Sequence, residues 1–335
     1  MHTKTKVISV GTFLPDQIVK SDDIFKEIDS ERYGLPVTWM SDEMGIIERR
    51  MSNDDTVPSE LAIPAAQKAL DTCGINKDHI DLIIFCGIER DRPEPATAHI
   101  IQDQLGLKAE HVFDVANACY GFMDGVCIAS NFIRSKLVRY ALIVTGEVPT
   151  RVLRSFVRQL KAGVDLPTAK KMIGGLSVGD AGGAVVLGAS EIGEQAGFES
   201  FIKNVDSSHN DKCQYRVRGD GEIEGQMLMA KISAYGFKLH KQIIHQTLDS
   251  AGWDSFDWML SHQTGSRNFE QISSMNIVPK AKIIKTYDRL ANITSATFPL
   301  NYEKMCETGE VEPGDRIGGC FAGSGLTIGQ FCYSF

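Results

Sequence analysis

The sequence lacks the features that mark membrane, secreted or nucleic-acid-binding proteins. Its 335 residues include 35 lysines and arginines against 43 aspartates and glutamates, so a formal net charge of -8 offers no general basic face for phosphates. No apolar run approaches the length that spans a bilayer, and the first residues contain no apolar core of a signal peptide. We therefore expect a globular, cytoplasmic protein that binds neither membrane nor nucleic acid.

Metal and nucleotide motifs are also missing. The eight cysteines form no Cys-x-x-Cys pair and no His/Cys cluster at zinc spacing, which predicts free thiols in a reducing compartment and no metal site. The glycine-dense segment 174–183 contains neither G-x-G-x-x-G nor a P-loop lysine. It predicts a tight turn that leads into a strand at 184–187.

The apolar pattern is that of an α/β protein. Strand-like runs at 82–86, 140–144 and 184–187 alternate with helix-like stretches at 59–71 and 97–105. This alternation predicts a buried, largely parallel sheet covered by helices.

The two halves of the chain also share a weak self-similarity. Any two βα units share glycine caps and apolar strands, but three matches in the same order, about 175 residues apart, favour an internal duplication. We predict an N-terminal half at 1–188 and a C-terminal half at 189–335, with Cys119 and Asn292 in equivalent places at the starts of paired helices. The matched segments are 70–74 and 81–87 with 248–252 and 257–263, 113–119 with 287–292, and 139–146 with 315–322.

Cys119 is the candidate nucleophile. It follows a predicted strand and stands at the start of a helix predicted to run to about Ser135. The positive field of a helix N-terminus favours the thiolate form of such a thiol. A lone cysteine in an apolar context is more often structural, and the other seven are interpreted in that way.

Three further segments supply groups that a thiol nucleophile would need. His262 closes an apolar strand and can donate or accept a proton, although alone it fits a polar strand cap. The amide of Asn292 can donate to an oxyanion, although alone it fits a helix N-cap. The small residues 323–325 allow backbone N–H groups to approach a ligand oxygen.

Six segments resemble, in order, the motifs of β-ketoacyl-acyl carrier protein synthase III and its relatives, the initiation-type condensing enzymes of fatty-acid and polyketide biosynthesis. This resemblance implies a thiolase fold, in which two duplicated βαβ-rich halves form five α-β-α-β-α layers, and a homodimer. The segments are 45–50, similar to G-I-x-E-R-R; 113–122 around Cys119; 179–187, similar to G-D-G-A-G-A-x-V-L; 262–267, similar to H-Q-A-N-x-R; 292–300, similar to N-T-S-A-A-S-I-P-L; and 323–325, similar to G-[AG]-G.

The resemblance implies a role for each matched residue. Cys119 would accept an acyl group, His262 and Asn292 would complete a catalytic triad, and the backbone N–H groups of Cys119 and Ser324 would form an oxyanion hole. Gly323 and Gly325 would belong to the same substrate-binding turn. The substrates would be thioesters of coenzyme A or of phosphopantetheine on an acyl carrier protein, with no permanently bound cofactor.

Other positions imply substrate contacts or depart from the family pattern. Trp39 would stack on the adenine of coenzyme A, and Arg267 belongs to the His262 motif. Glu94 falls where an aromatic side chain normally reaches from the partner subunit into the acyl pocket, and a buried carboxylate there is costly unless paired or protonated. Glu43 replaces the usual arginine and Gly265 the usual asparagine. These departures favour a specialised relative in secondary metabolism.

A basic segment suggests how a carrier protein would bind. Arg151, Arg154 and Arg158 recur at helical spacing within 151–174, which is longer than the family norm. Such charge runs are usually a solvated helix face. Near a cleft, the same face would steer an acidic acyl carrier protein.

Three functions remain open at this stage. The first is condensation of the Cys119-bound acyl group with a malonyl- or β-ketoacyl-type thioester, and the second is transfer of that group to an alcohol or amine. The third is a non-catalytic partner subunit. Asn292 favours the first, because an enolate needs a second donor more than an incoming oxygen or nitrogen does.

Overall fold

The structure is a computed structural model that describes residues 4–335, and its first central sheet is built from the most apolar runs of the N-terminal half. The strand order is β1 (Thr5–Phe13), β7 (Ala181–Ala189), β6 (Tyr140–Glu147), β4 (Ile80–Cys86) and β5 (His111–Val115). The predicted strands at 82–86, 140–144 and 184–187 all lie in this sheet.

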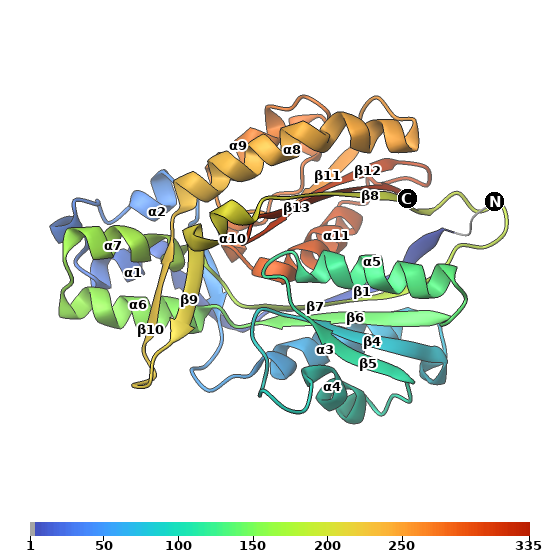
Figure 1. Ribbon diagram of the computed structural model, residues 1–335, viewed down its shortest axis with the longest axis horizontal. Helices are drawn as coiled ribbons and strands as arrows, with labels where there is room; N and C mark the ends of the chain where they lie inside the picture. The colour runs from blue at the N-terminus through green and yellow to red at the C-terminus, as the bar shows by residue number, and fades with distance from the viewer. Residues whose placement is uncertain (1–3) are drawn as a thin grey trace.

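The prediction of a largely parallel sheet is wrong. β4 runs parallel to β5 and β6, but β7 runs antiparallel to β6 and to β1. A parallel pair needs a connection that crosses the sheet. The helices between β6 and β7, α6 (Thr150–Ala162) and α7 (Leu166–Met172), instead lie beyond the end of the sheet, so the chain returns in the opposite direction (Figure 1).

A second, smaller sheet belongs to the C-terminal half. Its order is β11 (Trp258–Ser261), β12 (Arg316–Gly323), β13 (Thr327–Ser334) and β8 (Gly197–Val205). β11 is parallel to β12, and the other pairs are antiparallel. This sheet is therefore also mixed.

Helices separate and cover the two sheets, which gives five layers (Figure 1). α3 (Pro58–Thr72) and α4 (Thr97–Leu105), predicted at 59–71 and 97–105, cover the outer face of the first sheet. α5 (Gly121–Arg134) and α11 (Thr297–Glu307) lie between the sheets, and α8 (Met229–Ala251) and α9 (Ser266–Ser273) lie outside the second. Within residues 4–335, no helix is both long and apolar enough to cross a membrane.

The repeated segments occupy matching places in the two halves. The glycines that follow α3 and α8, Gly74 and Gly252, both adopt left-handed conformations, with φ of 66° and 69°. Each is followed by a strand that pairs in parallel with its neighbour, β4 or β11. The boundary at 188/189 falls at the end of β7 and stays a prediction.

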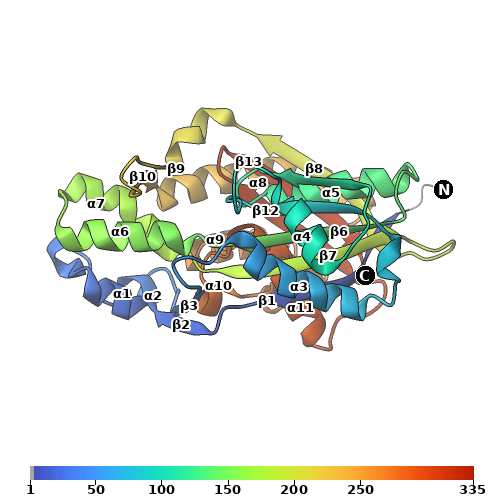
Figure 2. The same ribbon diagram turned by 90° about the horizontal axis from the view of Figure 1, so that it is seen from below.

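The remaining elements gather at one end of the layers, beside α6 and α7 (Figure 2). They are α1 (Ser21–Glu27), α2 (Trp39–Asp42), α10 (Tyr287–Leu290) and the hairpins β2 (Gln17–Lys20) with β3 (Glu48–Met51) and β9 (Cys213–Val217) with β10 (Ile223–Met227). Short 3₁₀ turns lie at Ser30–Tyr33, Lys77–His79, Ile173–Ser177, Ser207–Lys212, Lys280–Lys282 and Thr294–Ala296. Many of these elements share one apolar cluster, which continues to α8, α9 and the second sheet.

Candidate active site

A cavity of about 70 Å³ brings together residues from both halves of the chain. Cys119 reaches it from the loop between β5 and α5, His262 from the end of β11, and Asn292 from the loop before α11. Gly323 and Ser324 line it from the end of β12. The residues that the sequence proposed as triad and oxyanion hole therefore share one site.

The two loops that carry Cys119 and Asn292 have the same unusual backbone. Ala118, directly before Cys119, has φ of 47°, and Ala291, directly before Asn292, has φ of 59°. Left-handed conformations are uncommon for residues with a side chain, and they cluster at functional sites. The shared geometry supports the predicted equivalence of Cys119 and Asn292.

The electrostatic environment of Cys119 differs from the prediction. Burial raises the pKa of its thiol well above the usual value, and nearby Cys213 and Glu147 raise it further. The prediction that the thiolate is favoured is therefore wrong in direction, because loss of solvation outweighs the field at the start of α5. The thiol has to lose its proton during attack rather than before it.

His262 lines the same cavity, and its surroundings define which ring nitrogen carries the proton. The Thr297 hydroxyl donates to the backbone oxygen of Thr294 at 2.7 Å, so its oxygen remains to accept from His262 Nδ1, at 3.4 Å. This arrangement leaves Nε2 of His262 without a proton. Burial lowers the pKa of His262 to about 4, so the ring is neutral near neutral pH and can act as a proton acceptor.

The amide of Asn292 has a defined orientation. Its Oδ1 accepts from the backbone N–H of Thr294 at 3.0 Å, so Nδ2 is the free end of the amide. Its backbone is held by the glycine-dense segment, since Asn292 N–H donates to Ser177 O and Gly179 N–H donates to Asn292 O. Asn292 is therefore a fixed donor, and the segment expected to be only a turn supports it.

The turn at 323–325 lies directly against the Cys119 loop. A Cβ atom on Gly323 would lie 2.8 Å from Asn117 O and 3.1 Å from the backbone nitrogen of Tyr120. Only a residue without a side chain lets β12 end this close to the nucleophile. This contact favours the oxyanion hole proposed for the N–H groups of Cys119 and Ser324, which stays a prediction.

A buried carboxyl group lies behind the site. Burial raises the pKa of Glu147 to about 8, and Glu147 accepts hydrogen bonds from Ser295 Oγ and from Ile88 N–H. The protonated form therefore prevails near neutral pH, and Glu147 becomes a negative charge near Cys119 only as the pH rises past about 8. Ser295, which stands where the family motif has alanine, links this carboxyl group to the Asn292 loop.

The raised pKa of Cys119 predicts an unusual pH dependence of its reactivity. Because a raised pKa keeps the thiol protonated to higher pH, alkylation of Cys119 by iodoacetamide should become steadily faster between about pH 7 and about pH 9.5, past the usual cysteine range. Mass spectrometry of the Cys119 peptide measures the rate. A rate that is already constant at about pH 7 would show that the thiolate is formed in advance.

The structure adds cavity residues that the sequence did not reveal. Cys213 begins β9, His240 lies on α8, and Asn268 lies on α9; all three line the cavity. Cys213 had been assigned a structural role, and the two others belong to no motif. Each becomes part of the site only because its element folds over the cavity.

Four of the proposed binding residues do not line the cavity. Trp39 begins α2 and stacks on Phe25, with ring centroids 6.0 Å apart. Arg267 on α9 and Glu94 before α4 are exposed, and Gly325 lies one residue beyond the lining. Within one chain the expected cost of burying Glu94 therefore does not arise. The binding roles of these residues stay predictions.

The structure explains why Gly265 stands where the family motif has an asparagine. Its φ is 134°, and a Cβ there would lie 2.9 Å from Cε and 3.0 Å from O of Met44. An asparagine at this position would be strained and would collide with the Met44 segment. The segment around Met44 has therefore closed in on the place that the family side chain would occupy.

The predicted basic face for a carrier protein is largely neutralised. The three arginines do follow one stripe of α6, but each guanidinium is engaged by a carboxylate of this chain. The pairs are Arg151 with Glu89 at 3.2 Å, Arg154 with Asp54 at 2.7 Å and Arg158 with Glu222 at 3.0 Å. Acids from distant parts of the sequence therefore offset much of the positive charge of this helix, and the docking role of the three arginines stays a prediction.

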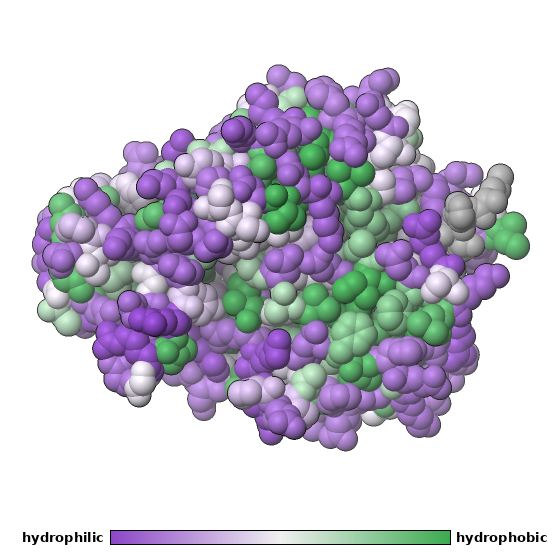
Figure 3. Space-filling view, viewed as in Figure 1, coloured by the Kyte–Doolittle hydropathy of each residue, from purple (hydrophilic) through white to green (hydrophobic). Residues whose placement is uncertain are grey.

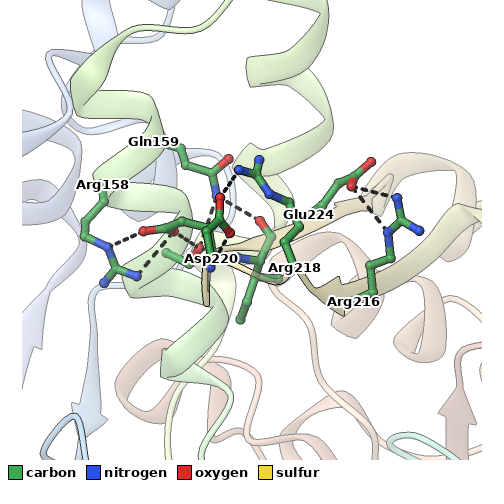
Figure 4. A network of polar contacts seen from close by, with 9 residues as sticks. Arg158, Gln159, Arg216, Arg218, Asp220 and Glu224 are labelled. Carbon is green, nitrogen blue, oxygen red and sulfur yellow. Dashed lines mark hydrogen bonds and ion pairs between the residues drawn. The ribbon is translucent and has the colours of Figure 1, made fainter.

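One of these pairs, Arg158 with Glu222, ties α6 to the hairpin β9–β10 (Figure 4). Glu222 accepts from Arg158 and, at 2.5 Å, from Ser155 Oγ, while Gln159 Nε2 donates to Ile223 O at 2.8 Å. The hairpin carries Cys213 to the cavity. Reversing the charge of Arg158 would therefore disturb a wall of the site as well as the surface.

Comparison with known sequences identifies the family. Residues 113–204 match the profile described as 3-Oxoacyl-[acyl-carrier-protein (ACP)] synthase III, and residues 248–335 match the profile of its C-terminal part. Beta-ketoacyl-[acyl-carrier-protein] synthase III of Xanthomonas oryzae pv. oryzae is 30% identical over 96% of this chain and 97% of its own. The enzyme of the same name from Novosphingobium aromaticivorans is 28% identical over 98% of both chains.

Solved structures confirm the thiolase fold expected from the motifs. Xanthomonas campestris OleA with bound lauric acid and lauroyl-CoA superposes with a TM-score of 0.91, at 24% identity and over 100% of both chains. The cerulenin-bound form of OleA gives 0.90 at 25% identity, over 99% of this chain and 97% of that one. By sequence and by fold, the chain belongs to the 3-oxoacyl-[acyl-carrier-protein] synthase III family of condensing enzymes.

Proposed function

We propose that Cys119 accepts an acyl group from a thioester and that the bound group is condensed with a malonyl- or β-ketoacyl-type thioester. The observation that carries this proposal is the shared cavity of Cys119, His262 and Asn292. A nucleophile, a neutral proton acceptor and a fixed amide donor are the groups that such a two-step reaction needs.

In the first step, Cys119 Sγ attacks the thioester carbonyl while His262 Nε2 takes the thiol proton. The carbonyl oxygen becomes an oxyanion, which the N–H groups of Cys119 and Ser324 stabilise. When the intermediate collapses, the carbon–sulfur bond of the donor breaks and the proton on His262 passes to the leaving thiolate. The product is an acyl-enzyme, and His262 is neutral again.

In the second step, the second thioester forms a carbanion. With a malonyl-type thioester, loss of carbon dioxide leaves the electron pair on an enolate, whose oxygen accepts from Asn292 Nδ2. The enolate carbon attacks the acyl group on Cys119, and a carbon–carbon bond forms as the carbon–sulfur bond to Cys119 breaks. Cys119 leaves as a thiolate that carries the charge of the lost carboxylate, and it takes up one proton from solvent, which completes the cycle.

The acyl donor and the assembly are parts of the same proposal. The family relationship favours thioesters of coenzyme A or of acyl carrier protein as donors. The reaction would belong to a cytoplasmic pathway, either fatty-acid biosynthesis or a secondary pathway such as polyketide biosynthesis.

A homodimer is supported by β5, an edge strand of the first sheet whose residues are all half-exposed. Figure 3 shows hydrophobic surface over the region of α5 and β5, which includes the partly buried Phe113 and Val115. In such a dimer, Glu94 of a second copy could reach the site.

Transfer of the acyl group to an alcohol or amine is the alternative function. The fixed orientation of Asn292 favours condensation, because its free Nδ2 is a donor for an enolate oxygen. An incoming hydroxyl or amine gains little from such a donor.

A thioester panel tests the function. The protein is incubated with acyl-CoA or acyl-carrier thioesters, with and without a malonyl or β-ketoacyl thioester and with alcohol or amine acceptors. We expect an acyl adduct on the protein that disappears only when the second thioester is added, together with a product extended through a new carbon–carbon bond. An ester or amide product instead would establish acyl transfer.

A further inference from the structure

The cavity beside Cys119 contains a second histidine for which the proposed reaction has no role. His240 lies on α8 and is 3% exposed, and it lines the cavity together with His262. A buried polar group normally has a partner for each of its polar atoms. The partners of His240 therefore show which of its atoms remains for a ligand.

Gln330 on β13 determines the protonation of this ring. Gln330 Nε2 lies 3.1 Å from the backbone oxygen of His240, which can only accept, so this end of the amide must be the donor. The opposite end, Oε1, accepts from Thr247 Oγ1 at 2.7 Å. The Thr247 hydroxyl also lies 2.9 Å from Ile243 O, so the contact with His240 O is the one that defines the orientation of the amide.

The second hydrogen of the same amide group points to the imidazole. Gln330 Nε2 lies 3.2 Å from His240 Nδ1, so Nδ1 accepts and the ring proton resides on Nε2. Gln330 does not line the cavity, whereas His240 does, and the contact with Gln330 leaves Nε2–H as the free donor of the ring. Burial lowers the pKa of His240 to about 3, with a contribution from nearby His262, so the ring is neutral.

The rest of the cavity shows what such a donor would meet. The lining contains no lysine, arginine, aspartate or glutamate among the described residues, and much of it is apolar, as at Met227, Ile232 and Phe237. Asn268 Oδ1 is buried there without a hydrogen-bond partner. The cavity therefore offers neutral polar groups on an apolar wall, which suits a neutral oxygen better than a carboxylate.

We propose that His240 Nε2–H is a specificity-determining donor that recognises a carbonyl or hydroxyl oxygen on the acyl chain loaded onto Cys119. This inference rests on the proposed acylation of Cys119 and narrows its substrates to short 3-oxoacyl or hydroxyacyl thioesters. A volume of about 70 Å³, at roughly 10–15 Å³ for each water, has room for about five waters, which favours a short chain.

Acetoacetyl and butyryl thioesters of pantetheine test the inference, since they differ only in the oxygen that His240 would bind. The kcat/KM for acylation of Cys119 is measured by mass spectrometry in the wild type and in His240→Leu, which keeps the size and removes the donor. His240→Gln restores an amide donor. His245→Leu, on the exposed side of the same helix, is the matched control.

We expect the wild type to prefer the acetoacetyl thioester. His240→Leu should lower kcat/KM for this substrate by roughly tenfold to a hundredfold, as expected when a buried hydrogen bond is lost, and should leave the butyryl thioester within about threefold. His240→Gln should recover part of the preference, and His245→Leu should resemble the wild type.

Two outcomes would overturn the inference and leave the proposed function intact. One is equal acylation of the wild type by both thioesters, and the other is an equal loss for both in His240→Leu. If His240→Leu does not fold, as judged by its melting curve, the inference is tested by two other results: the preference of the wild type for the acetoacetyl thioester and the partial preference of His240→Gln. Absence of any Cys119 adduct in the wild type would overturn the proposed function, and the role of His240 with it.

Discussion

Cys119→Ala should form no acyl-enzyme with any thioester that acylates the wild type. The reason is that Cys119 belongs to the loop that packs against the turn at Gly323, although Cys213 lines the same cavity and interacts with Ser324. Without the nucleophile the reaction cannot be divided into two steps, so condensation should fall by on the order of a thousandfold or more. Intact-protein mass spectrometry should show one added acyl group in the wild type and none in the variant.

Cys213→Ala is the matched control for this experiment. It removes the second cavity thiol and leaves Cys119 in place, so the adduct should remain and should map to the Cys119 peptide. An adduct that persists in Cys119→Ala and is lost in Cys213→Ala would transfer the role of nucleophile to Cys213. An adduct on Cys86 or Cys320 would contradict the site altogether, because both are fully buried in the sheets.

Asn292→Ala should separate the two steps of the reaction. The variant should still acylate Cys119 near the wild-type rate, but the loss of the Nδ2 donor should slow condensation by on the order of a hundredfold to a thousandfold. Single-turnover acylation and steady-state product formation measure the two steps independently. Normal turnover of the natural substrate pair by Asn292→Ala would favour acyl transfer over condensation.

His262→Ala provides the contrast, because the proposed proton acceptor serves the first step as well. We expect acylation itself to slow in this variant by on the order of a hundredfold, the usual contribution of general base catalysis. The loss should become smaller as the pH rises and more of the Cys119 thiol ionises by itself. A wild-type acylation rate in His262→Ala would show that the proton of Cys119 leaves by another route.

Much of the architecture could be predicted from the sequence because it depends on local patterns. The runs at 82–86 and 140–144 are strands and the stretch 97–105 is a helix, since apolar spacing and helix-ending glycines act within a few residues. The motifs around Cys119, His262 and Asn292 likewise identified the central residues of the cavity. Such residues are recognisable because chemistry restricts both their type and their immediate neighbours.

Strand direction and electrostatic state depended on contacts between distant segments. The sheet is mixed because α6 and α7 lie beyond its end rather than across it, and helix spacing along the chain carries no such information. The charge of the predicted basic face is partly neutralised because Asp54, Glu89 and Glu222 reach α6 from other elements. Charge patterns in a sequence do not reveal which partners fold against them.

The sequence alone therefore determined the fold class, the duplicated halves and the identity of the proposed nucleophile with its histidine and asparagine. Only the tertiary structure decided the protonation of those groups and the orientation of their hydrogen bonds, because both depend on how distant segments bury them together. Burial raised the pKa of Cys119 against the field of its helix. In the same way, Gln330 on the last strand determines which nitrogen of His240 on α8 carries the proton. No sequence motif connects these two residues.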